Sequence, residues 1–120
     1  MNPDELRKRT QKFAMNIIDL VQSLPHQSAA FVIGRQLLRC GTSVGANYRA
    51  ACRAKSGADF ISKLKMVEEE CDESIYWMEL LSEMKPAAAL SLAKPMEEAH
   101  QILSIIVASI KTARSSNRQS

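Results

Sequence analysis

The residues best suited to bind a ligand are basic side chains in one stretch of the chain, from residue 28 to residue 55. The stretch contains five positive charges and no acidic residue. Four of the five are arginines, and a planar guanidinium can donate two hydrogen bonds to one phosphate or carboxylate. The stretch therefore predicts a surface for a nucleic-acid backbone or for an acidic protein face. The basic residues are Arg35, Arg39, Arg49, Arg53 and Lys55.

A purely acidic stretch follows between residues 66 and 83, with seven carboxylates and no basic residue. The arginines of one copy of the chain could pair with Glu69, Glu70 or Glu73 of a neighbouring copy. Three interpretations of the arginines are therefore open: a solvated face, a contact between subunits, and a contact with nucleic acid. The acidic residues are Glu68, Glu69, Glu70, Asp72, Glu73, Glu79 and Glu83.

The residue types that perform catalysis do not form a recognisable pattern. His26 and His100 lie far apart in the sequence, and there is no HxxxH spacing. The one Glu-x-x-His spacing, Glu97 to His100, falls short of the two that a di-iron bundle requires. Glycine-rich phosphate loops and a Ser-His-Asp arrangement are also missing from the sequence. We therefore expect a protein that is not an enzyme and that uses no cofactor and no metal.

Length and composition indicate one domain, residues 1–120, with 46% apolar and 24% charged residues. The sequence contains no uninterrupted stretch of about 20 apolar residues, so it predicts no membrane span. The N-terminal residues are polar and acidic, unlike a secretory signal. The three cysteines, Cys40, Cys52 and Cys71, lack CxxC spacing and are expected to be free thiols. These features predict a cytoplasmic protein with no membrane partner.

Four segments show the alternating three- and four-residue apolar spacing of a helix bundle. Ser28 is a candidate N-cap, and Pro95 suits the first turn of the last helix. Short connections between long helices favour antiparallel neighbours. The sequence therefore predicts an all-α, antiparallel, up-down-up-down four-helix bundle. The expected helices are 5–24, 28–54, 58–84 and 95–114, followed by a polar tail at 115–120.

The second predicted helix has two features away from its apolar side. Its four arginines fall within an arc of about 80° opposite the core face, where they are candidate nucleic-acid-binding residues. Gly41 and Gly45 have the spacing that allows another helix to approach closely. That helix could belong to the same bundle or to a neighbouring subunit, and we assign the two glycines to an oligomer interface.

The third predicted helix is apolar on too many sides for an isolated bundle. Exposed apolar surface that includes Trp and Tyr usually marks an interface. This pattern predicts that the protein is not a monomer. The candidate interface residues are Met66, Glu69, Glu73, Tyr76, Trp77 and Leu80.

The run from Gln36 to Ser56 resembles the signature of the "four helix bundle protein" family, the intervening-sequence proteins of 23S ribosomal RNA genes. The family pattern reads roughly Q-L-x-R-A-x-x-S-x-x-x-N-I-A-E-G-x-x-R, followed by a Phe and an acidic helix. The chain departs from it over residues 48–51, where Tyr-Arg-Ala-Ala replaces Ile-Ala-Glu-Gly and makes the helix more basic. The matching residues are Gln36, Leu37, Arg39, Ser43, Asn47 and Phe60, and Arg53 lies one position before the last arginine of the pattern.

This resemblance implies an antiparallel four-helix bundle that assembles as a ring-shaped homopentamer, in a family whose function is largely unknown. A group related to this family acts as accessory proteins for the reverse transcriptases of diversity-generating retroelements. In those accessory proteins, a basic surface is thought to contact nucleic acid and the enzyme. The leading expectation is therefore a non-enzymatic oligomer that binds RNA or DNA backbone. The alternative is a protein-interaction scaffold, or an adaptor for a nucleic-acid enzyme, whose basic and acidic helices pair between subunits.

Overall fold

The computed structural model describes the backbone of residues 1–119 and the side chains of residues 1–117. Its described part contains helices and no strand, which confirms the all-α prediction. The helices are α1 (Pro3–Gln22), α2 (Ala29–Cys52), α3 (Gly57–Met84), the short 3₁₀ helix η1 (Pro86–Ala88) and α4 (Ala89–Gln119).

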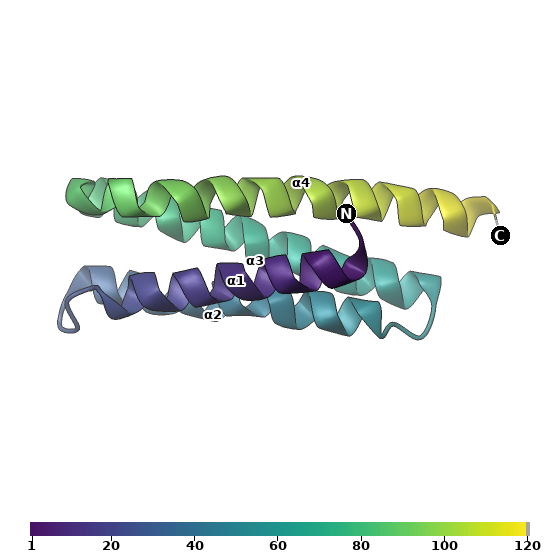
Figure 1. Cartoon of the computed structure of the whole chain (residues 1–120), viewed down its shortest axis with the longest axis horizontal. Coiled ribbons are helices and arrows are strands. Elements are labelled where there is room, and N and C mark those ends of the chain that lie inside the picture. The colour runs from purple at the N-terminus through teal and green to yellow at the C-terminus, as the bar shows by residue number, and fades with distance from the viewer. Residues whose placement is uncertain (120) are drawn as a thin grey trace.

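The four long helices form a bundle of 52 × 21 × 19 Å (Figure 1). α2 and α3 pack most extensively, α3 also packs against α4, and α1 packs mainly on α2. The contact between α1 and α4 is small. α4 runs the full length of the bundle and extends past the other helices at the end that also holds the N-terminus (Figure 1). α1 is therefore held to the bundle mainly through α2.

Side chains that cap the backbone determine where three helices begin. Asn2 accepts a hydrogen bond from the Glu5 amide at 2.8 Å, and Ser28 accepts one from the Phe31 amide at 3.1 Å. Ser56 accepts one from the Asp59 amide at 3.1 Å. These bonds satisfy amide groups that have no partner within the helix. The prediction of Ser28 as an N-cap is confirmed.

The core follows the predicted apolar seams. Phe13, Leu37, Leu64 and Ile106 are each 0–1% exposed, one from each long helix. Thr10 is fully buried as well, and its hydroxyl donates a hydrogen bond to the Arg7 carbonyl at 3.0 Å. The seams therefore fix how each helix is rotated about its own axis, and the polar faces follow from that rotation.

The glycines of α2 lie inside the bundle and pack on α1, which corrects their assignment to an oligomer interface. A Cβ added to Gly41 would lie 3.1 Å from Cγ2 of Ile17, and one added to Gly45 would lie 3.3 Å from Oγ1 of Thr10. Both glycines are buried. They let α1 and α2 approach within a single chain.

α4 is longer at both ends than the predicted helix at 95–114. It begins at Ala89, so Pro95 lies inside it and not in its first turn. The proline deprives the Ser91 carbonyl of its helical partner, and Ser91 is exposed, so that water can solvate the carbonyl. Leu92, 1% exposed, holds these first turns against the core.

The C-terminal end of α4 differs from the prediction in a similar way. The expected polar tail at 115–120 is helical as far as Gln119, and residue 120 lies outside the described residues. This stretch has no Gly or Pro to end the helix. Asn117 also lies over the start of α3, where a Cβ on Gly57 would meet its side-chain oxygen. The first three helices lie within two residues of their predicted bounds.

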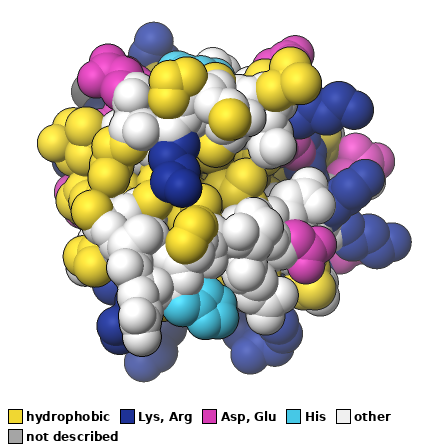
Figure 2. Space-filling view, turned by 90° about the vertical axis from the view of Figure 1, so that its left-hand side faces the viewer, with side chains coloured by type: hydrophobic (Ala, Val, Ile, Leu, Met, Phe, Trp, Pro, Cys, Tyr) yellow, Lys and Arg dark blue, Asp and Glu magenta, His cyan; other side chains and the backbone are white. Residues whose placement is uncertain are grey.

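The end of the bundle that carries the α1–α2 and α3–α4 connections is apolar in its centre. Figure 2 shows hydrophobic side chains gathered in the middle of this end and basic side chains mostly around its edge. Leu90 is 88% exposed here, and Met84 is 43% exposed. Within residues 1–119, no helix is both long and apolar enough to cross a membrane.

Candidate nucleic-acid interface

The three arginines of α2 and Arg53 at its C-cap are all exposed, as their arc opposite the core face predicts. They do not share one electrostatic environment. Among the described residues, no carboxylate lies within ion-pair distance of Arg35, Arg49 or Arg53. Arg35 is separated from Arg49 by 14 positions, which corresponds to about 21 Å along a helix. The unpaired charge is therefore divided between the two ends of α2.

Arg39 is different because it pairs with the acidic helix of its own chain. Its guanidinium contacts Glu70 at 3.5 Å and makes a closer ion pair with Glu73. Glu73 also accepts a hydrogen bond from the indole nitrogen of Trp77 at 3.2 Å. Burial raises the pKa of Glu70, and Arg39 opposes that shift. The basic and acidic helices thus meet within one subunit at Arg39, where the charge is partly neutralised.

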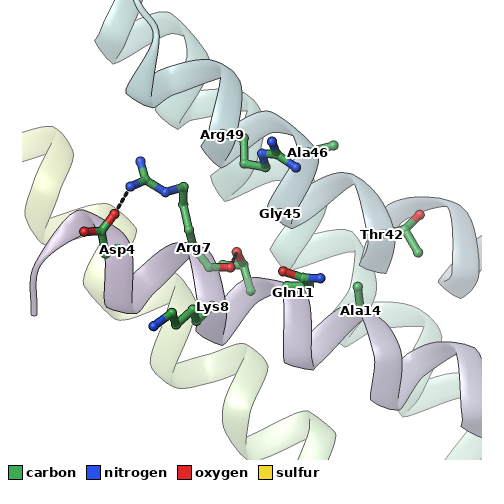
Figure 3. Close-up of a pocket in the computed structure, with 10 residues that line it drawn as sticks. Asp4, Arg7, Lys8, Gln11, Ala14, Thr42, Gly45, Ala46 and Arg49 are labelled. Carbon is green, nitrogen blue, oxygen red and sulfur yellow. Dashed lines mark hydrogen bonds and ion pairs between the residues drawn. The ribbon is translucent and has the colours of Figure 1, made fainter.

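A groove of about 750 Å³ runs between α1 and α2 near the N-terminus of the chain. Figure 3 shows Arg7 on one side of this groove and Arg49 on the other. Arg7 makes an ion pair with Asp4, which the same figure marks with a dashed line. The groove is lined by Asp4, Arg7, Lys8, Thr10, Gln11, Ala14, Thr42, Gly45, Ala46 and Arg49.

Arg7 and Lys8 are basic residues of this surface that the sequence analysis did not select. The signal was the run Arg7-Lys8-Arg9 near the start of the first helix. The three residues differ in where they point. Arg9 faces α4, where its guanidinium bonds both carboxylate oxygens of Glu98 at 2.6 and 2.7 Å, and this hydrogen bonding raises the pKa of Arg9. Arg7 and Lys8 line the groove instead.

The outer face of α3 exposes aromatic and apolar side chains, as expected from its sequence. Tyr76 is 53% exposed and Met66 is 46% exposed, whereas Trp77 and Leu80 are half-buried. The rings of Tyr76 and Trp77 lie edge to face, with centroids 5.0 Å apart. Glu69 is exposed on the same helix. That another subunit covers this face of α3 stays a prediction.

One cluster of potential metal ligands occurs in the described part of the chain. The ligand atoms of Cys40, Glu70 and Glu73 lie within 4.8 Å of one another. Burial raises the pKa of the Cys40 thiol, which opposes the thiolate that a metal requires, and Arg39 already pairs with both carboxylates. Cys40, Cys52 and Cys71 all carry free thiols. We therefore interpret the cluster as an ion-pair network beside a buried thiol.

Comparison with known proteins identifies a matching family and similar solved structures. A family model described as "23S rRNA-intervening sequence protein" matches residues 4–108. A crystal structure from Bacteroides thetaiotaomicron VPI-5482, of a protein with unknown function from the S23 ribosomal protein family, is 34% identical in sequence. The similarity covers 88% of this chain and 98% of that one, with a TM-score of 0.82. No curated protein matches the chain.

Proposed function

The chain belongs to the 23S rRNA-intervening sequence protein family, and from this premise we propose that it binds the phosphate backbone of RNA or DNA. It would do so as a cytoplasmic, non-enzymatic oligomer. The observation that carries the proposal is the exposure of Arg49 and Arg53 without a carboxylate partner in the described residues. Arg7 and Lys8 extend the same basic surface onto α1.

The geometry favours recognition of the backbone over recognition of bases. Arginine and lysine contacts to phosphate position a protein on nucleic acid but carry no sequence information. The residues lining the groove include no aromatic side chain on which a base could stack. We therefore expect binding with little sequence preference.

The experiment is a titration of a mixed-sequence, 5′-labelled RNA at several salt concentrations, read by fluorescence anisotropy. Each phosphate neutralised on a single strand contributes about 0.7 to the slope of log affinity against log salt. Lys8, Arg49 and Arg53, the three cations of this surface with no ion pair among the described residues, therefore predict a slope of about −2. Removing one phosphate-contacting cation, by Arg49→Ala or Arg53→Ala, should reduce the slope by about 0.7 to 1.

Two variants make the test specific. Lys94→Ala removes an exposed cation from α4, away from the basic surface, and should leave the slope unchanged. Arg39→Ala should have a smaller effect than Arg49→Ala, because Arg39 already pairs with Glu70 and Glu73. A wild-type affinity that does not vary between low and moderate salt would contradict the proposal.

A second candidate function, a protein-interaction scaffold or adaptor, is favoured by the outer face of α3. Tyr76 and Met66 are about half exposed there, and such apolar surface is typical of an interface. The resemblance to the family suggests that the partner is a further copy of the chain, in a homopentamer. Sedimentation velocity tests this: Tyr76→Glu should yield smaller species, and Glu79→Gln, an exposed change on the same helix, should not. A wild-type chain that sediments as a monomer at high concentration would exclude the oligomer.

A further inference from the structure

The floor of the α1–α2 groove is built from small residues where the two helices approach each other. A Cβ on Gly45 would lie 3.3 Å from Oγ1 of Thr10 and 3.5 Å from the Thr10 carbonyl carbon. Ala14 and Ala46 line the groove from the two helices. Larger side chains at these positions would fill the space. The space between α1 and α2 is therefore concave here, whereas larger side chains fill the space between most pairs of packed helices.

The rim of the groove is basic on both sides. Arg7 stands on α1 and Arg49 on α2, and Gln11 lies about one turn further along α1 (Figure 3). The carboxylate that lines the groove is Asp4, whose side chain is 77% exposed and pairs with Arg7. Such exposed pairs contribute little and exchange readily. A phosphate can therefore replace Asp4 as the partner of Arg7.

We propose that this groove binds the sugar–phosphate backbone of a single strand in preference to a duplex, with a phosphate held between Arg7 and Arg49. This inference rests on the proposed function and names its substrate class. A volume of about 750 Å³ lies in the range of pockets that hold compact ligands, enough for a short segment of one backbone. A duplex carries its phosphates on a rigid cylinder that is too wide to enter, and it can reach only the rim.

The same groove leaves the bases outside. Its lining supplies cations, an amide and hydroxyl groups, and no aromatic ring. A single strand can turn its bases away from the protein because its backbone rotates freely, whereas the two strands of a duplex are fixed relative to each other. The selectivity is therefore for strandedness and not for sequence.

The test fills the groove without changing its charge. Ala46 is exposed and lines the groove, so Ala46→Leu adds bulk there at little cost to a helix. We expect Ala46→Leu to weaken binding of a 5′-labelled single-stranded RNA and of the matching single-stranded DNA by about tenfold, through the loss of at least one phosphate contact. Binding to the corresponding duplex should stay within about twofold of wild type. Ala93→Leu, at an exposed alanine of α4 outside the groove lining, is the matched control.

A second variant tests the rim. Asp4→Asn removes the carboxylate that pairs with Arg7 and should raise single-strand affinity by about two- to threefold at low salt. Circular dichroism confirms that each variant is folded. Single-strand binding by Ala46→Leu that equals wild type, or an equal loss for single strand and duplex, overturns the groove assignment.

The two proposals fail in distinguishable ways. If the wild-type chain binds no nucleic acid even at low salt, the proposed function is wrong. If it binds with a slope that depends on Arg49 and Arg53 but is indifferent to Ala46→Leu and Asp4→Asn, the function holds and only the groove is excluded.

Discussion

Replacing Gly41 with alanine tests the idea that the glycines of α2 exist to admit α1. An interior glycine costs a helix about 0.8–1.0 kcal/mol relative to alanine, so the replacement gains that amount from the backbone. The new Cβ would lie 3.1 and 3.2 Å from two side-chain carbons of Ile17, which is fully buried and β-branched. Overpacking of such a site costs about 1–3 kcal/mol. Taking about 2 kcal/mol for the clash, we expect a net destabilisation of about 1 kcal/mol.

The assay is urea unfolding followed by circular dichroism, with Gly34→Ala as the matched control. A Cβ on Gly34 meets the flexible end of the Leu24 side chain at 2.6 Å and Cγ1 of Val21 at 3.3 Å, so it makes one tight contact with a β-branched side chain where Gly41 makes two. Gly34→Ala should therefore be less destabilising than Gly41→Ala. If Gly41→Ala stabilises the chain by about 1 kcal/mol, the approach of α1 is not what requires a glycine there.

Two further predictions concern the ends and seams of the helices. Arg9→Met should lower the free energy of unfolding by about 1–2 kcal/mol, because it leaves the partly buried Glu98 without its two charged hydrogen bonds across the α1–α4 seam. The measurement is the midpoint of urea unfolding. An unchanged midpoint would show that apolar contacts alone hold α1 to α4. The hydrogen bond that Asp59 accepts from the Lys55 amide lowers the pKa of its carboxyl below the ordinary value of 3.8. The ionised carboxylate therefore stabilises the folded state above pH 3.8, and this contribution disappears as the pH falls through the lowered pKa. Asp59→Asn should accordingly flatten the fall in unfolding free energy between about pH 5 and pH 2, and an equally steep fall in the variant would refute this.

The orientation of the α2 arginines could be predicted from the sequence because it depends on one regular helix. A residue advances about 100° around the axis, so the buried positions Leu37 and Val44 fix the angle of every other side chain. Arg35, Arg39 and Arg49 are exposed for this reason. Arg53 is the C-cap of α2 and is exposed as well. The same argument placed Met66 and Tyr76 outside the core of α3.

The partners of these side chains could not be predicted, because a partner depends on how two helices are placed along each other. Arg39 meets Glu73 only because α2 and α3 are antiparallel with one particular axial offset. Arg7 lines the same groove as Arg49 because Gly45 lets α1 approach at Thr10. The spacing of apolar residues along the sequence contains no information about the axial offset between two helices. For the same reason, it left open whether the glycines of α2 contact α1 or another subunit.

The departure of this chain from its family pattern explains why its basic surface keeps its charge. The pattern has a glutamate where this chain has Ala50. Residues three positions apart are neighbours on a helix, so a glutamate at position 50 would lie beside Arg53 and neutralise part of its charge. With alanine there and Arg49 added, no carboxylate of α2 opposes the arginines, and the one acidic residue lining the groove is the exposed Asp4. The proposed phosphate binding on this face therefore depends on Arg49 and on the lack of a carboxylate at position 50, two positions where the chain departs from the family pattern that its second helix resembles.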